Sequence, residues 1–245
     1  MMETIGLFGG TFDPIHLGHL RAAKEVRRLA RLDRILFIPS FLPPHKASGT
    51  GASPTDRLRM VELACRGRKG FEASPVEVEA GEKSYSILTL RKIRALSPGA
   101  RLFFILGVDA FLDIGTWREY ERVLEECQFV VMGRPGFELD RARSVLGGKL
   151  RDAIGPLAGG EGIGGRLPPR TRIFLLPIRA LDISSTAIRE RSRRGETLDG
   201  LVPGAVEAYI RKHQLYRGRE EPWQKKRKNG SPKGACPRPS GWPSR

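Results

Sequence analysis

The fold is decided by the string Gly9-Gly10-Thr11-Phe12-Asp13-Pro14-Ile15-His16-Leu17-Gly18-His19, which directly follows the apolar run at residues 5–8. This pattern predicts a buried strand, a glycine turn and a helix that opens with two histidines. Residues at i and i+3 lie on one helix face, so the imidazoles of His16 and His19 should point the same way. Glycines let a ligand approach the backbone, and a helix N-terminus offers free N–H groups to phosphate. The string therefore predicts a polyphosphate site.

A His-x-x-His pair has other uses, because it can bind a metal or simply lie on the surface. The cysteines, Cys65, Cys127 and Cys236, show no ligand-like spacing, and no Glu lies between the histidines as in a zinc protease helix. Neither Lys-Ser nor Lys-Thr follows the glycines, so the Walker pattern is absent. Taken with the strand before it, the string favours the phosphate site over a metal pair.

A second string, Asp182-Ile183-Ser184-Ser185-Thr186-Ala187-Ile188-Arg189, follows the strand-like run at residues 173–177. Its hydroxyl cluster is a plausible helix start. Arg189 lies four residues after Ser185, one turn along the same face, so hydroxyls, amides and a guanidinium can converge on one anion. The alternative is an ordinary helix cap and a solvated arginine. As a cap it is weak, because no Glu or Gln occupies the third helical position.

Both strings resemble signatures of one superfamily of nucleotidyltransferases. The first contains its His-x-Gly-His mark, and the longer string looks like the nicotinate-nucleotide adenylyltransferase branch. The second resembles the Ile-Ser-Ser-Thr-x-Ile-Arg signature, which in that superfamily grips the ATP phosphates. The resemblance covers roughly residues 3–216.

The resemblance implies that the 5′-phosphate of nicotinate mononucleotide attacks the α-phosphorus of ATP, giving deamido-NAD and pyrophosphate, with Mg²⁺ bound through the ATP phosphates rather than by protein ligands. Adjacent phosphates should favour protonated imidazoles. The implied catalytic residues are His16, His19, Lys46 and Arg189. The implied ATP contacts are Gly9, Gly10, Thr11, Phe12, Gly107, Asp109, Ile183, Ser184, Ser185 and Thr186. The implied nicotinate-nucleotide contacts are His45, Tyr85, Thr89, Trp117 and Arg134.

The loop residues in this set also have ordinary interpretations. The cations His45 and Lys46 can simply be solvated. Asp109 can accept hydrogen bonds from a ribose or an adenine amine, or can merely cap a helix. Tyr85 and Trp117 can stack on a pyridine ring or can pack in the core.

One segment departs from the family. Many members have an Asp directly before the Thr-Leu pair, whereas this chain has Leu88 before Thr89. We expect this to weaken the transfer of roles to the neighbouring residues. Arg118 is the one arginine obviously placed near the expected nicotinate pocket.

Apolar runs alternate with helix-length amphipathic segments through the rest of the chain. Strands are expected at residues 35–38, 102–106, 129–132 and 173–176, helices at 57–65 and 87–96, and an extended segment at 71–78. This alternation predicts an α/β fold, a Rossmann-like doubly wound parallel sheet whose ligands bind at the carboxyl ends of the strands.

The expected catalytic domain spans residues 1–216. Within it, residues 137–170 hold eight glycines and are expected to form a long surface excursion with a short helix near residues 141–145. Residues 217–245 hold nine Lys or Arg against two Glu, without periodicity, and are expected to be a disordered basic tail.

The net charge of +16 fits anionic nucleotide substrates and equally fits weak, non-specific contact of the tail with nucleic acid. No signal peptide or membrane-length apolar run is found, so we expect a cytoplasmic protein that contacts no membrane. Three alternatives stay open: a sister adenylyltransferase that uses nicotinamide mononucleotide or phosphopantetheine, a cytidylyltransferase, and a nucleic-acid-binding protein with a degenerate nucleotide site. The sequence indicates no oligomeric state.

Overall fold

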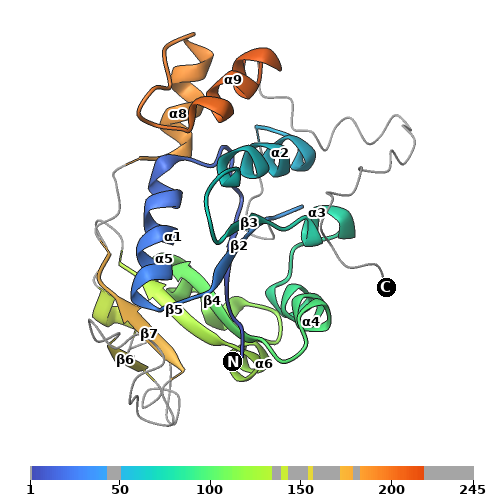
Figure 1. Ribbon diagram of the computed structural model, residues 1–245, viewed down its shortest axis with the longest axis vertical. Coiled ribbons are helices and arrows are strands. Elements are labelled where there is room, and N and C mark those ends of the chain that lie inside the picture. Colours follow the sequence, from blue (N-terminus) through green and yellow to red (C-terminus); the bar gives the residue numbers. More distant parts are fainter. Residues whose placement is uncertain are drawn as a thin grey trace.

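A computed structural model describes residues 2–42, 51–133, 139–142, 154–156, 172–178 and 183–217. Within these ranges one sheet has the strand order β3-β2-β1-β4-β5-β7-β6, and every neighbouring pair is parallel (Figure 1). The predicted doubly wound parallel sheet is therefore confirmed. The strands are β1 (Thr4–Gly10), β2 (Arg34–Pro39), β3 (Phe71–Ala73), β4 (Arg101–Gly107), β5 (Gln128–Met132), β6 (Ile154–Pro156) and β7 (Ile173–Leu176).

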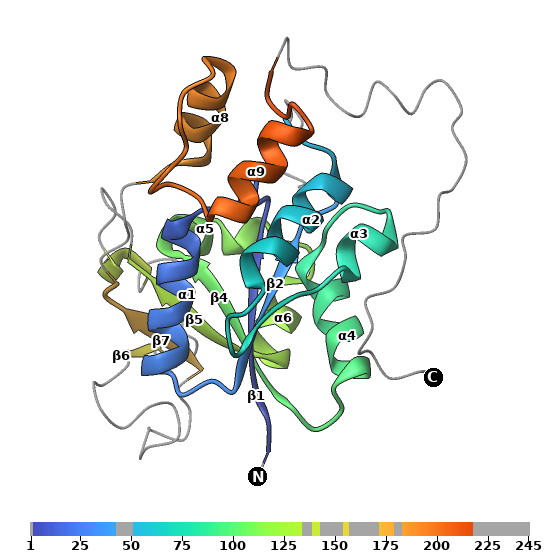
Figure 2. The same ribbon diagram turned by 45° about the horizontal axis from the view of Figure 1, so that its top comes forward.

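Helices cover both faces of the sheet (Figure 2). One face carries α1 (Leu17–Leu29) and α2 (Pro54–Cys65). On the same side, α8 (Ser185–Arg193) and α9 (Gly204–Lys212) lie beyond the carboxyl ends of the strands, and α9 packs against α2 (Figure 1). The other carries α4 (Ser86–Leu96), α5 (Val108–Leu112) and α6 (Tyr120–Glu126). Short elements are α3 (Val76–Ala80) and the 3-10 turns Ile114–Thr116 and Leu139–Arg141.

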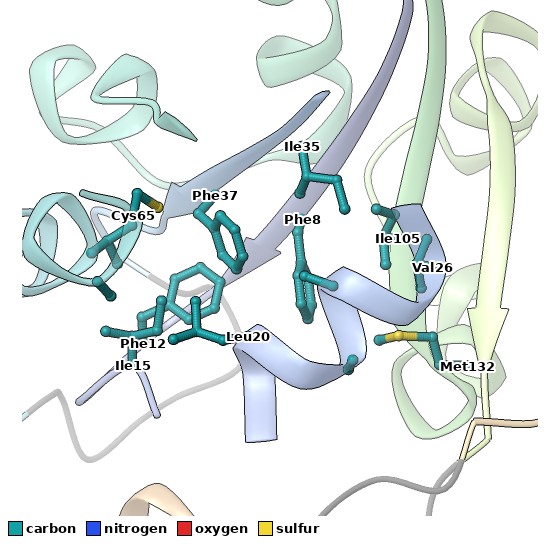
Figure 3. Close-up of a cluster of buried hydrophobic side chains, with 14 of the residues drawn as sticks. Phe8, Phe12, Ile15, Leu20, Val26, Ile35, Phe37, Cys65, Ile105 and Met132 are labelled. Carbon is teal, nitrogen blue, oxygen red and sulfur yellow. The ribbon is translucent and has the colours of Figure 1, made fainter. Parts of the chain in front are cut away.

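The strands are apolar along their whole length because both of their faces are buried. In β1, Ile5 and Leu7 enter the cluster under α4, α5 and α6, whereas Phe8 enters the cluster under α1 and α2. Figure 3 shows the cluster under α1 and α2, in which Phe8, Phe37 and Leu20 lie between the sheet and α1. This packing fixes the position of α1, and so of the histidines at its start.

Two expectations need correction. The extended segment expected at residues 71–78 is a strand only as far as Ala73, and α3 begins at Val76. Pro75 precedes α3, its carbonyl accepts a hydrogen bond from Glu79 at 2.8 Å, and its constrained φ of −82° is compatible with a helix start. The glycine-rich excursion contributes β6, which pairs with β7.

The short helix expected near residues 141–145 is, in its described part, the end of a 3-10 turn at Leu139–Arg141 and residue 142. The remainder of that segment and the tail from residue 218 lie outside the described residues. No helix in the described part of the chain has the length and apolar character needed to cross a membrane.

Candidate active site

The first motif lies at the point where the sheet reverses its winding. From β1 the chain builds outward through β2 and β3, then returns to place β4 on the other side of β1. Gly10 ends β1 and Gly107 ends β4, so both lie at the carboxyl edge beside this switch point. In open parallel sheets, ligands bind in the crevice at this position.

His16 and His19 face one another at the start of α1, as the spacing predicts. Their rings are stacked, with centroids 3.6 Å apart and planes inclined by 24°. The His16 backbone N–H donates to His19 Nδ1 at 3.3 Å, and the His19 N–H donates to His16 Nδ1 at 3.4 Å. The two histidines thus cap the helix reciprocally, as a Ser and a Glu do in a capping box.

This capping decides which nitrogen of each ring can donate. An Nδ1 atom that accepts a backbone N–H carries no proton, so each neutral imidazole holds its proton on Nε2. Protonation of Nδ1 would break the cap. In this geometry Nε2 is the ring nitrogen of each histidine that is left to donate to a ligand.

The first turn of α1 offers fewer open amides than expected. The Leu17 N–H donates to the Leu201 carbonyl at 2.8 Å, and the His19 N–H is used by His16. Two of the first three N–H groups of the helix are therefore already engaged within the protein.

Phe12 packs its ring against His19 and so supports the histidine pair. Its φ of 48° lies in the left-handed region, which a bulky residue rarely adopts, and its side chain is buried. The ring meets His19 edge-on at 5.1 Å, and a Cβ atom on Gly10 would lie 3.0 Å from it. Because this ring lies in the core, any contact of Phe12 with ATP is left to its backbone.

The second motif meets the first across the sheet edge. Ser185 Oγ donates to the Pro14 carbonyl at 3.1 Å, and Arg189 Nη1 donates to the Asp13 carbonyl at 2.9 Å. Arg189 Nη2 also donates to Thr186 Oγ1 at 3.3 Å. Ser184 is the N-cap of α8 and accepts from the Ala187 N–H at 3.1 Å. Ile183 lies half-buried directly before this cap.

Asp13 joins distant parts of the chain beneath the site, a role that the sequence prediction missed. Its buried carboxylate accepts from the Gly51 and Ala52 N–H groups at 2.7 and 3.1 Å. It also accepts from the Tyr216 hydroxyl at 2.9 Å. Burial and the neighbouring Asp13 carboxylate raise the pKa of Tyr216 well above its ordinary value, so the phenol keeps its proton and donates.

Arg57 is a second missed residue. Its fully buried guanidinium donates to the carbonyls of Thr11 at 2.7 Å, Phe41 at 3.2 Å and Ala52 at 3.3 Å. Burial lowers the pKa of Arg57, and the Asp13 carboxylate opposes that shift. The sequence held a signal, because Arg57 lies four residues before Val61, on the apolar face of α2.

Ser40 adds a polar group at this edge. Its N–H donates to the Gly10 carbonyl at 2.9 Å, and its buried Oγ has no hydrogen-bond partner among the described residues. A lone serine in a loop gave no signal in the sequence.

The residues expected to hold the second nucleotide lie around α4 and α6. The Arg118 guanidinium carbon lies 5.1 Å from the centroid of the Tyr85 ring, and Trp117 meets Phe104 at 5.7 Å. Tyr85 and Trp117 are partly buried against the core, so each has both a packed and an accessible part. The structure thus brings Tyr85 and Arg118 together.

Thr89 is turned into the protein. Its buried hydroxyl donates to Glu77 Oε1 at 2.6 Å, so its predicted donation to the nicotinate nucleotide competes with an internal partner. Burial raises the pKa of Glu77, whereas hydrogen bonds from Ser84 and Thr89 oppose the shift. Leu88 lines the small cavity of about 20 Å³ beside this pair.

Asp109 is the second residue of α5, which has Gly107 as its N-cap and no side-chain cap. The alternative that Asp109 is merely a helix cap is therefore wrong. His45, Lys46 and Arg134 lie outside the described residues, as does Asp182. Gly9 and Thr11 are half-buried at the end of β1 and just after it.

Comparison with known proteins agrees with this geometry. A relative from Desulfatibacillum aliphaticivorans, named "Probable nicotinate-nucleotide adenylyltransferase", is 44% identical over 216 residues, covering 86% of this chain and 99% of the relative. A relative of the same name from Geobacter sulfurreducens is 42% identical over 213 residues, covering 86% and 97%.

Among solved structures, the chain is similar in fold to Plasmodium falciparum nicotinic acid mononucleotide adenylyltransferase complexed with NaAD. The TM-score is 0.64 at 19% identity, and the match covers 87% of this chain and 97% of that chain. The family described as Cytidylyltransferase-like matches residues 7–191. The chain belongs to this Cytidylyltransferase-like family.

Proposed function

We propose that this chain is a nicotinate-nucleotide adenylyltransferase, which transfers the adenylyl group of ATP to nicotinate mononucleotide. The observation that carries the proposal is the meeting of the two motifs. Ser185 and Arg189 donate to the backbone of Pro14 and Asp13, directly before the stacked histidines. The name of the relatives supports the same activity.

In the proposed step, a 5′-phosphate oxygen of nicotinate mononucleotide attacks the α-phosphorus of ATP. A P–O bond forms, the bond from the α-phosphorus to the oxygen bridging to the β-phosphate breaks, and pyrophosphate leaves with that electron pair. The attacking phosphate is already an anion, so the step needs neither a general base nor a covalent enzyme intermediate. Catalysis is then positioning and stabilisation of charge in the transition state.

The proposed site residues have separate tasks in this step. His16 and His19 donate from Nε2 to oxygens near the reacting phosphorus. Arg189 orients the β- and γ-phosphates together with Ser185 and Thr186. Lys46 adds positive charge, and the backbone at residues 9–11 allows close approach of the phosphates. Asp109 accepts hydrogen bonds from the adenosine.

The residues present fit a magnesium ion that arrives with the nucleotide. Mg²⁺ keeps several waters and usually binds through substrate phosphates and few carboxylates. In the described part of the chain, no group of three or more His, Cys, Asp or Glu side chains could hold a metal ion by itself. When bound, Mg²⁺ would neutralise charge on the polyphosphate.

The acceptor pocket favours an acid over an amide. Nicotinate and nicotinamide mononucleotides differ in a carboxylate against a carboxamide, so ring stacking on Trp117 discriminates little. The Arg118 guanidinium over Tyr85 places a cation beside the predicted pyridine site. A donor-rich pocket leaves a donor unpaired when it binds the amide, at a cost of about 1–3 kcal/mol.

The test is to supply ATP with nicotinate mononucleotide, nicotinamide mononucleotide or phosphopantetheine, and to measure pyrophosphate release. We expect kcat/KM for nicotinate mononucleotide to exceed that for the amide at least ~10-fold. Equal or better use of another acceptor would reject this branch and retain adenylyl transfer. Turnover with CTP in preference to ATP would reject the adenylyl donor.

A further inference from the structure

A second charged region lies along α1, on the side of the helix that faces the loop before β3. Here the surface is hollowed into a groove of about 1060 Å³. Its walls carry six Lys or Arg against one acidic residue, Glu25. The cations are Arg21, Lys24, Arg27 and Arg28 from α1, with Arg68 and Lys69 from the loop before β3.

Most of the groove cations lack an acidic partner in the part of the chain that the structure describes. Elsewhere, arginines are commonly paired with acids, as Arg34 is with Glu3 at 2.9 Å and Arg211 is with Glu207 at 2.8 Å. In the groove, Arg21, Lys24, Arg28 and Lys69 form no ion pair with any described residue.

The two inner arginines are held in place by backbone carbonyls, and Arg27 also lies near the Asp33 carboxylate. Arg27 Nε donates to the Asp33 carbonyl at 3.1 Å, and Arg68 Nη1 donates to the Ala64 carbonyl at 2.9 Å. Carbonyl partners fix a guanidinium but leave its full charge to attract an anion. The groove therefore presents concentrated and unbalanced positive charge.

The groove begins at Leu17, next to His16, but its cationic end lies away from the proposed active site. A residue of an α-helix adds 1.5 Å along its axis, so Arg28 lies about 18 Å along α1 from His16. Arg68 and Lys69 precede Phe71, the first residue of β3, and so lie at the amino edge of the sheet. The site lies at the carboxyl edge.

The groove also has apolar walls. Leu20 and Leu32 line it, together with Phe71, which is half-buried and packs its ring against Phe37 at a centroid distance of 5.3 Å. A fixed aromatic ring beside lines of cations is the arrangement that binds single strands, because phosphates meet cations while bases stack on the ring. A duplex keeps its bases inside and an acidic peptide has none, so neither would use Phe71.

We propose that the α1 groove binds single-stranded nucleic acid without sequence preference, through Lys24, Arg28 and Lys69 on phosphates and Phe71 on a base. This function is independent of adenylyl transfer. It is also distinct from any contact made by the basic tail, which is present in all the proteins compared below.

The experiment uses the full chain and a fluorescent uridine strand of about twelve nucleotides, within the usual site size. Anisotropy is measured over a range of salt concentrations for the parent, for Lys24→Glu/Arg28→Glu and for Lys83→Glu/Lys92→Glu. The last pair makes the same change of charge at two exposed positions, one before α4 and one within it. Each phosphate contact on a single strand contributes about 0.7 to the salt slope.

We expect the groove variant to reduce the slope of log K against log salt by about 1.4 and to bind at least ~10-fold more weakly at low salt. The control variant should bind like the parent. Equal losses in the two variants, or no loss in either, would overturn the proposal.

Further strands test the occupant. An abasic strand of equal length should bind ~10-fold more weakly than the uridine strand, and Phe71→Leu should remove that difference. A thymidine strand should bind as the uridine strand does. Equal binding of a duplex, or equally strong competition by polyglutamate, would overturn the single-strand assignment. Photo-crosslinks from a thiouridine strand should fall in residues 17–32 or 66–71. Crosslinks confined to residues 217–245 would overturn the assignment of strand binding to the groove.

Discussion

The two halves of the proposed active site are built in different ways. Around the histidines, Asp13, Arg57 and Tyr216 are buried and hold the backbone through hydrogen bonds to N–H and carbonyl groups. Around the predicted nicotinate pocket, Arg118 stacks on Tyr85 at a surface where the arginines pair with Glu119. Charge changes in the transition state at the first half, where fixed donors matter most. In the proposed reaction the second half would bind the acceptor, a task that tolerates adjustable side chains.

Replacing Arg57, the buried cation in the half of the site around the histidines, should give the largest effect. Arg57→Met removes a positive charge near the Asp13 carboxylate and leaves the carbonyls of Thr11, Phe41 and Ala52 without this donor. We expect the free energy of unfolding to fall by about 3–5 kcal/mol, measured by denaturant titration. The matched control is Arg59→Met, which removes an exposed pair with Glu62 from the same helix and should cost about 1 kcal/mol or less. Similar losses would refute the distinction.

Replacing His19 tests whether prearranged hydrogen-bond donors stabilise the transition state. His19→Ala removes one donor at the developing charge and should lower kcat at least ~100-fold, about 2.7 kcal/mol, measured by pyrophosphate release. The control is the exposed His213→Ala, which lies on α9's C-terminal cap and should keep parental turnover. Near-parental turnover of the His19 variant would contradict the mechanism.

Tyr216 tests whether support from a distant segment matters. Tyr216→Phe removes one hydrogen bond to a buried carboxylate and should destabilise the fold by about 1.5–3 kcal/mol. Tyr209→Phe is the control, because Tyr209 donates to Asp56 at 2.9 Å in a more exposed setting. We expect the Tyr216 variant, unlike the control, also to lower kcat. An unchanged kcat would limit Tyr216 to stability.

Arg118 tests the adjustable half. Arg118→Gln should reduce the preference for nicotinate over nicotinamide mononucleotide by up to ~10-fold, with little change in stability because the side chain is exposed. Arg122→Gln is the control, since Arg122 also pairs with Glu119 but has no contact with Tyr85 among those described. Equal effects of both variants on the ratio of kcat/KM values would assign the selectivity elsewhere.

Glu77 gives the smallest expected effect, and one that depends on pH. Burial raises the pKa of Glu77 in the folded state, so the native protein binds a proton more tightly than the unfolded chain does. The stability due to the protonated form is present below the ordinary glutamate pKa and is lost as pH rises through the raised value. Glu77→Gln should therefore gain stability relative to the parent as the pH rises above the ordinary glutamate pKa, measured by denaturant titration at a series of pH values. A difference that stays constant with pH would contradict this.

Local pattern was sufficient to predict the parallel sheet apart from β6 and to place the two histidines on one face. Strands buried on both faces are apolar throughout, and His16 and His19 must share a face when a helix begins between the strand and Gly18. The structural roles of Arg57 and Tyr216 were not predicted because their partners, Thr11 and Asp13, are remote in sequence. The inward turn of Thr89 depends on Glu77, which lies on α3 where an extended segment was expected.

The bond between Asp13 and Tyr216 joins residues 203 positions apart. During synthesis, both histidines emerge first, yet the support beneath them is complete only when almost the whole domain has been made. A chain that stalls or is cut before Tyr216 carries every histidine and serine of the motifs but lacks the finished cradle. Only a chain that extends to Tyr216 can therefore complete the hydrogen-bonded support beneath the histidines.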